Sequence, residues 1–141
     1  MGATGRCLCG AVSFEAEEVD THVHGCHCSM CRNWSGGPML AAGVGSLSFQ
    51  GEENIQRYSS SDWAERAFCG RCGSNLFYRL KETDHHILCM GCFDDQSPFE
   101  LVGEIYVDEK PPGYDFAGDH PRQTGEEFLA SLGQQPDAPQ P

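Results

Sequence analysis

Cys69-Gly70-Arg71-Cys72-Gly73 is the stretch of this 141-residue sequence that is most informative about the fold. Two cysteines separated by two residues and followed by glycine form a zinc knuckle, in which a tight turn brings two thiolates together. Glycine suits this turn because it adopts positive φ without a steric penalty. A knuckle supplies two ligands, whereas a structural zinc is held by four. The stretch therefore predicts a second pair of cysteines that folds onto it.

Cys7-Leu8-Cys9 supplies such a pair near the N-terminus. We expect an extended strand over residues 6–15, in which side chains alternate and Cys7 and Cys9 point to the same face. Together with Cys69 and Cys72 they complete a four-thiolate site, the signature of a structural zinc. Such a site joins distant segments, so the free energy of metal binding would become free energy of folding.

A third cluster, Cys26-His27-Cys28-Ser29-Met30-Cys31, combines both spacings and supplies three ligands. Three protein ligands with an open fourth position are typical of a catalytic zinc. Spacing alone also allows a second structural zinc, with its fourth ligand from His22, His24, His27 or Cys89. His27 lies between two ligands on the expected strand, so its side chain should face away from the metal and be packed or solvated.

The two remaining cysteines, Cys89 and Cys92, allow three interpretations: a further knuckle half, a redox pair, or two buried thiols. We favour buried thiols because free cysteine behaves as a small hydrophobic residue.

Arg32 directly follows Cys31, the last expected ligand of the third cluster. It is either a contact for a substrate carboxylate or a surface arginine paired with an acid.

Length and composition predict one domain over residues 1–133, followed by a polar, proline-rich segment, residues 134–141, that should be disordered. No stretch approaches the roughly 20 apolar residues of a membrane helix, and no secretory signal opens the chain. We therefore expect a cytoplasmic protein, in which nine cysteines at metal spacings indicate zinc rather than disulfides. A formal net charge of -12 without basic stripes argues against nucleic acid as a partner.

Alternating apolar residues and short turn segments predict a mainly β, antiparallel fold. Besides the strand over residues 6–15, which holds Val12 and Phe14 as core candidates, strands are expected at 22–26, 38–43, 46–49, 56–59, 65–68, 76–80, 86–90 and 101–106. One short C-terminal helix is expected near residues 124–132, with Thr124 as N-cap and Gly133 beyond its end.

Three motifs in this order resemble the glutathione-dependent formaldehyde-activating enzyme family, which includes the centromere protein V type of domain. They are G-R-C-x-C-G-A-V-x-F, G-C-H-C-S-x-C-R-x-x-S-G and R-x-F-C-x-x-C-G-S-x-L, beginning at Gly5, Gly25 and Arg66. The resemblance extends to the G-x-x-D-D element at residues 91–95 and to Lys110-Pro111-Pro112. The chain departs from the usual pattern at Gly113, where tryptophan is common, and in carrying Cys89 and Cys92.

The resemblance implies coiled antiparallel β-sheets clamped by zinc knuckles, with two zinc ions per chain. It assigns Cys7, Cys9, Cys69 and Cys72 to the structural zinc and Cys26, Cys28 and Cys31 to the catalytic zinc. The implied enzyme is a carbon–sulfur lyase, similar to S-(hydroxymethyl)glutathione synthase, with a low-molecular-weight thiol and a small aldehyde as its partners. The alternative is a non-catalytic zinc module that binds a protein partner.

Overall fold

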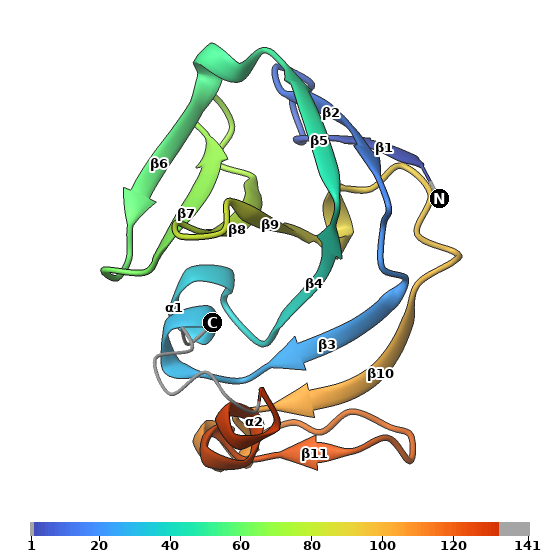
Figure 1. Cartoon of the computed structure of the whole chain (residues 1–141), viewed down its shortest axis with the longest axis vertical. Helices are drawn as coiled ribbons and strands as arrows, with labels where there is room; N and C mark the ends of the chain where they lie inside the picture. Colours follow the sequence, from blue (N-terminus) through green and yellow to red (C-terminus); the bar gives the residue numbers. More distant parts are fainter. Residues whose placement is uncertain (1, 133–141) are drawn as a thin grey trace. The chain divides into compact units, whose positions relative to one another are not determined.

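The computed structural model describes residues 2–132, and within them the chain forms two compact units (Figure 1). The first unit comprises residues up to 21 and residues 41–99, and the second comprises residues 22–40 and those from 100 onward. The expectation of a single domain over residues 1–133 stays a prediction. The tail predicted at residues 134–141 and the expected helix stop at Gly133 lie outside the described residues.

The first unit contains two antiparallel arrays of strands. One is a three-stranded sheet in the order β1 (Ala3–Arg6), β2 (Ser13–Glu17) and β5 (Ser46–Gln50). The other runs in the order β4 (Met39–Val44, from residue 41 onward in this unit), β9 (His85–Cys89), β8 (Asn75–Leu80), β7 (Ala64–Cys69) and β6 (Ile55–Ser59). Two single-turn 3-10 helices, Glu52–Asn54 and Met90–Cys92, connect strands.

Aromatic residues pack together in the core of the first unit, alongside aliphatic side chains. The Phe14 ring lies 5.3 Å from that of Phe93 in an edge-to-face arrangement, and the rings of Phe49 and Phe77 stack at 5.5 Å. Val12 and Phe14 are buried, which confirms both core predictions. At Gly5 an added Cβ would lie 2.2 Å from the Phe14 ring and 2.3 Å from the Cys92 carbonyl oxygen, so only glycine permits this close approach.

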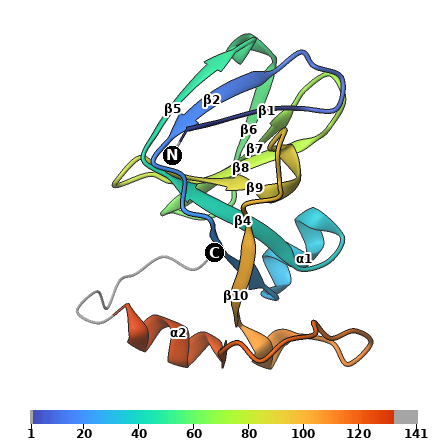
Figure 2. The same cartoon turned by 90° about the vertical axis from the view of Figure 1, so that its right-hand side faces the viewer.

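The second unit is built around β10 (Glu100–Ile105), which pairs in parallel with β3 (His22–Cys26) and with the short β11 (Arg122–Gln123). Helix α1 (Ser29–Ser35) follows β3, a 3-10 turn (Val107–Glu109) follows β10, and α2 (Gly125–Ser131) ends the described chain. Helix α2 follows directly on β11 at one end of this unit (Figure 2), and residues of the two elements are in contact.

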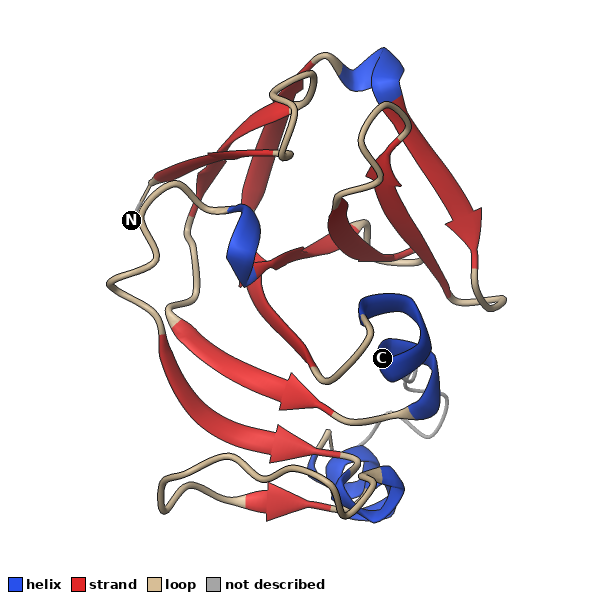
Figure 3. Ribbon diagram, turned by 180° about the vertical axis from the view of Figure 1, so that it is seen from behind, coloured by secondary structure: helices blue, strands red, loops and turns tan. Residues whose placement is uncertain are grey.

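The prediction of a mainly β fold is confirmed (Figure 3). Each strand expected beyond residue 20 is present within one or two residues of its predicted bounds. The expected C-terminal helix is α2, where the Thr124 side chain accepts from the Glu127 N–H and the Glu127 carboxylate accepts from the Thr124 N–H. Two features differ from the antiparallel, one-helix expectation: α1 is a second helix, and the pairs made by β10 are parallel.

Among residues 2–132 the structure contains no helix that is both long and apolar enough to cross a membrane.

Candidate metal centres

The first cysteine cluster consists of Cys7, Cys9, Cys69 and Cys72 and lies within the first unit. All four Sγ atoms lie within 4.8 Å of one another. The Cys7–Cys9 distance between Sγ atoms is 3.6 Å, and the Cys9–Cys69 distance is 3.9 Å. Zn–S bonds of about 2.3 Å at tetrahedral angles place sulfur atoms about 3.8 Å apart. The four thiols therefore fit a four-thiolate zinc.

Cys7 and Cys9 reach this cluster from a loop, so the prediction of one extended strand over residues 6–15 is wrong. Strand β1 ends at Arg6, β2 begins at Ser13, and the Cys7 N–H donates to the Val12 carbonyl across the loop at 2.9 Å. A turn follows, in which Gly10 has a φ of 80° and donates its N–H to the Cys7 carbonyl. This turn, and not strand alternation, directs both thiols to the same side.

The second half of the first cluster is the predicted knuckle. Cys69 is the last residue of β7, and Gly73, with a φ of 78°, donates its N–H to the Cys69 carbonyl at 2.8 Å. Ser74 joins the two halves, because its Oγ accepts from the Leu8 N–H at 2.9 Å and contacts the Cys72 Sγ at 3.2 Å. This hydrogen bond from Ser74 is the main cause that lowers the pKa of Cys72 to about 5.

The second cysteine cluster consists of Cys26, Cys28 and Cys31 and lies within the second unit. The three Sγ atoms are again within 4.8 Å of one another, and all three residues are buried. Cys26 is the last residue of β3, Cys28 is the N-cap of α1, and Cys31 lies in the first turn of α1. The Cys28 Sγ accepts from the Cys31 N–H at 3.4 Å, so the helix start itself orients two of the three thiols.

No other histidine, cysteine, aspartate or glutamate among the described residues of the second unit joins this group of three. His22 and His24 are exposed on β3, and Cys89 belongs to the first unit.

The three thiols of the second cluster influence one another's ionisation. Hydrogen bonds with Cys28 and then Cys31 raise the pKa of Cys26, whereas the hydrogen bond with Cys26 is the first cause that lowers the pKa of Cys28. Three buried thiols cannot all ionise side by side without a cation, because each new charge repels the others. The donor set thus suits a thiophilic cation such as Zn²⁺.

Tyr106 adds a buried polar group to this region. Its hydroxyl has no hydrogen-bond partner among the described residues, and its backbone has a positive φ of 58°. Burial raises the pKa of Tyr106 to about 12, and the charges of Cys26 and Cys28 act in the same direction. The hydroxyl therefore remains a neutral O–H donor at physiological pH.

The sequence predicts that the His27 side chain is either packed or solvated, and the structure shows it fully buried. There it takes part in a hydrogen-bond network. Its Nε2 lies 2.7 Å from Glu104 Oε1 and its Nδ1 lies 2.9 Å from the Tyr114 hydroxyl. Glu104 also contacts His120 and Arg122. Arg32 donates from Nε to the His27 carbonyl at 2.9 Å, so this atom binds the backbone beside the cluster. Glu104 is not among the site residues predicted from the sequence, although a carboxylate inside an apolar strand is a recognisable signal.

Cys92 matches the buried-thiol interpretation. Its Sγ donates to the Asn75 carbonyl at 3.0 Å, and burial raises the pKa of Cys92 to about 11. Cys89 is half-buried. Neither residue belongs to a group of three or more possible metal ligands within residues 2–132.

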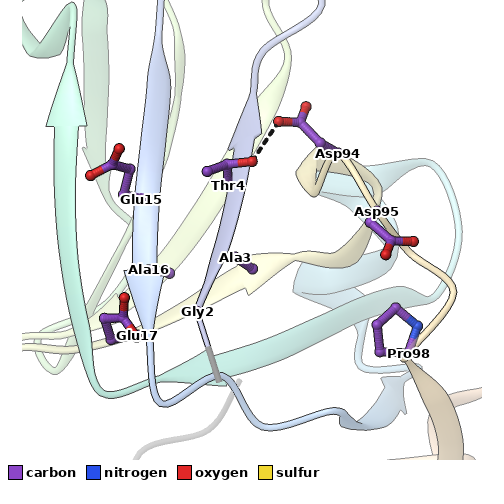
Figure 4. A pocket seen from close by; sticks show the side chains of 9 residues that line it. All are labelled: Gly2, Ala3, Thr4, Glu15, Ala16, Glu17, Asp94, Asp95 and Pro98. Atoms are coloured by element: carbon purple, nitrogen blue, oxygen red, sulfur yellow. Dashed lines mark hydrogen bonds between the residues drawn. The ribbon is translucent and has the colours of Figure 1, made fainter.

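The aspartates of the G-x-x-D-D element border an open cavity of about 510 Å³ in the first unit (Figure 4). Asp94 accepts from the Thr4 hydroxyl at 2.8 Å and pairs with Arg6, so it fixes the loop after β9 against β1. Asp95 accepts from the Ser97 N–H and hydroxyl. The cavity is lined by carboxylates and small residues and by no cysteine or histidine, so it offers no soft metal ligand.

Fold and clusters together define a mainly β protein with two places equipped to bind a metal ion. A sequence model of the glutathione-dependent formaldehyde-activating enzyme family matches residues 2–109, and the chain belongs to this family.

Relatives agree with this assignment along most of the chain. An uncharacterized lyase of Schizosaccharomyces pombe is 30% identical over 130 residues, covering 91% of this chain and 95% of the relative. A Halomonas elongata protein, named provisionally as a glutathione-dependent formaldehyde-activating enzyme, is 34% identical over 153 residues, with 92% and 95% covered. A Rhodobacter sphaeroides protein of known crystal structure shares the fold, with a TM-score of 0.57, 22% identity, and 84% of this chain and 98% of that chain covered.

Proposed function

We propose that this protein is a zinc-dependent carbon–sulfur lyase that handles adducts of a glutathione-like thiol and a small, formaldehyde-like aldehyde. The observation that carries the proposal is the buried second cluster, which offers three thiols to one metal and has no fourth member within its own unit among the described residues. The name of the family supports the choice of thiol and aldehyde. The name of the Schizosaccharomyces pombe relative supports a lyase.

We assign a structural zinc to the first cluster and a catalytic zinc to the second, which makes two ions per chain. The first cluster has four thiols within 4.8 Å of one another, so it would close the coordination sphere. Bound at the second cluster, zinc would supply Lewis acidity and an exchangeable coordination position. Three thiolates give this centre a net negative charge, which favours exchange of thiols over activation of water.

The proposed reaction is redox-neutral. In the synthetic direction a C–S bond forms, the carbonyl π bond breaks, and the proton of the thiol ends on the former carbonyl oxygen. The reverse direction restores the thiol and the aldehyde. Burial of Cys26, Cys28 and Cys31 keeps bulk water from the thiolates.

The function is tested by exchange NMR on a mixture of glutathione and formaldehyde, with and without zinc-loaded protein. Because the uncatalysed addition is itself fast, we expect an acceleration of about tenfold or more, well below the range typical of enzymes. Protein denatured before the addition of substrates serves as the control. Absence of acceleration, with this pair and with other thiols and bulkier aldehydes, would instead favour the module that binds a protein partner.

A further inference from the structure

Each polar atom of His27, in the backbone and in the ring, makes a hydrogen bond. Its N–H donates to the Ile105 carbonyl at 3.1 Å, and its own carbonyl accepts from Arg32 at 2.9 Å. Its two ring nitrogens contact Glu104 and Tyr114 at 2.7 and 2.9 Å. The residue is fully buried and sits between Cys26 and Cys28 in the chain.

Glu104 is the charged centre of this arrangement. It is 2% exposed, one carboxylate oxygen contacts His27, and the other contacts His120 and, at 3.0 Å, the Arg122 Nε. Burial acts to raise the pKa of Glu104, but the hydrogen bonds from His120 and His27 and the charge of Arg122 outweigh burial and lower it. The carboxylate is therefore ionised at neutral pH and can only accept, so His27 Nε2 carries the proton and donates.

The position of His27 connects Glu104 to the second cluster. Fixing the ring and both backbone groups of His27 also fixes the peptide planes on either side, and these determine where Cys26 and Cys28 direct their thiols. The rings of Tyr114 and Phe116, at 5.6 and 5.8 Å from the His27 ring, limit its remaining freedom. His27 thereby links Glu104 to the orientation of Cys26 and Cys28.

We propose that Glu104 is a positioning residue, which acts through His27 to preorganise Cys26 and Cys28 for a metal ion. This inference rests on the metal site of the proposed function and names the residue that sets its affinity. Groups hydrogen-bonded directly to metal ligands typically contribute about 10–100-fold to metal affinity, and Glu104 acts one residue further out, through His27. The first cluster, which lies in the other unit and has its own support from Ser74, should not depend on Glu104.

Glu104→Gln tests the proposal, because it keeps the shape of the side chain and removes its charge. Loading with Cd²⁺ and observing cadmium NMR separates the two sites, and competition with a chelator then gives the affinity of each site in the same molecule. We expect the affinity of the second cluster to fall about tenfold or more while that of the first is unchanged. Glu100→Gln, at an exposed position on the same strand, should change neither affinity.

Tyr114→Phe provides a second variant in case Glu104→Gln fails to fold, since it removes only the hydrogen bond at Nδ1 and leaves the buried charge paired. Its expected loss at the second cluster is smaller, about fivefold. Equal weakening at both clusters, or an unchanged second cluster in folded variants, would overturn the proposal. A wild-type protein without thiol–aldehyde activity, combined with a selective loss of affinity in these variants, would reject the proposed function and leave the role of Glu104 intact.

Discussion

Replacing Cys69 by serine is expected to prevent the first unit from folding. Cys69 is fully buried at the end of β7, and its Sγ lies 3.9 Å from that of Cys9, which arrives from the loop after β1. Apparent free energies of structural zinc binding are about 10–16 kcal/mol, comparable with the total stability of about 5–15 kcal/mol of a typical domain. Losing one of four ligands should therefore abolish cooperative unfolding, as followed by circular dichroism during a urea titration, together with one zinc per chain.

Cys92→Ser is the matched control for this variant. Cys92 is a buried cysteine of the same unit, and a serine hydroxyl can also donate to the Asn75 carbonyl. We expect this variant to retain both zinc ions and to unfold cooperatively. A soluble Cys69→Ser protein that unfolds cooperatively while lacking one zinc would contradict the assignment of the structural site.

Replacing Cys28 by serine should abolish activity and leave the fold in place. Cys28 is separated from Cys26 by one residue and from Cys31 by two, so it is part of both short ligand spacings in the second cluster. Without Cys28 only two thiols remain, and they are five positions apart in the sequence. Serine is a favourable N-cap, and its hydroxyl can replace Cys28 Sγ as the acceptor for the Cys31 N–H. Helix α1 should therefore persist. We expect one zinc to remain per chain, with turnover in the exchange NMR assay reduced to the uncatalysed rate.

Ser29→Ala, at the exposed neighbouring residue, is the control and should retain both zinc ions and full turnover. If Cys28→Ser kept wild-type turnover, the second cluster would not be the catalytic centre. If it lost both ions and its secondary structure, the two clusters would not be independent.

Strands were the most predictable part of the fold. Alternation of apolar residues located β3 at residues 22–26 and placed the other strands beyond it to within one or two residues. The parallel pairs of β10 could not be read in this way, because β3 and β10 are far apart in the sequence and no hairpin joins them. Alternation also failed at residues 6–15, where a turn at Gly10 interrupts it and separates β1 from β2.

The sequence does not predict helix α1 because the helix is short and offers a single apolar pair at helical spacing, Met30 and Trp34. Its seven residues, SMCRNWS, bury Cys31 alone, and its N-cap is a cysteine rather than one of the residues usually favoured there. The helix nevertheless completes the second cluster, since it carries Cys31 back to Cys26 and Cys28.

Both cysteine groups came together as their spacing predicts, but the network behind the second group did not follow from the sequence. Residues two or three apart, such as Cys69 and Cys72, meet through a local turn. Glu104 meets His27, His120 and Arg122 only after β3, β10 and β11 have paired. The four-ligand requirement of a structural zinc also predicts that the two distant pairs of the first cluster meet, whereas no such rule links Glu104 to its partners.

Staged removal of zinc tests the central claim of one closed and one open metal centre most directly. The measurement titrates the purified protein with a chelator of graded strength and follows released zinc, circular dichroism and turnover in the same samples. We predict two zinc ions per chain. The ion bound at the second cluster should leave under mild chelation together with turnover, while secondary structure stays intact. The ion bound at the first cluster should leave only as the first unit unfolds. Simultaneous release of both ions with unfolding, or a single ion per active chain, would contradict the account.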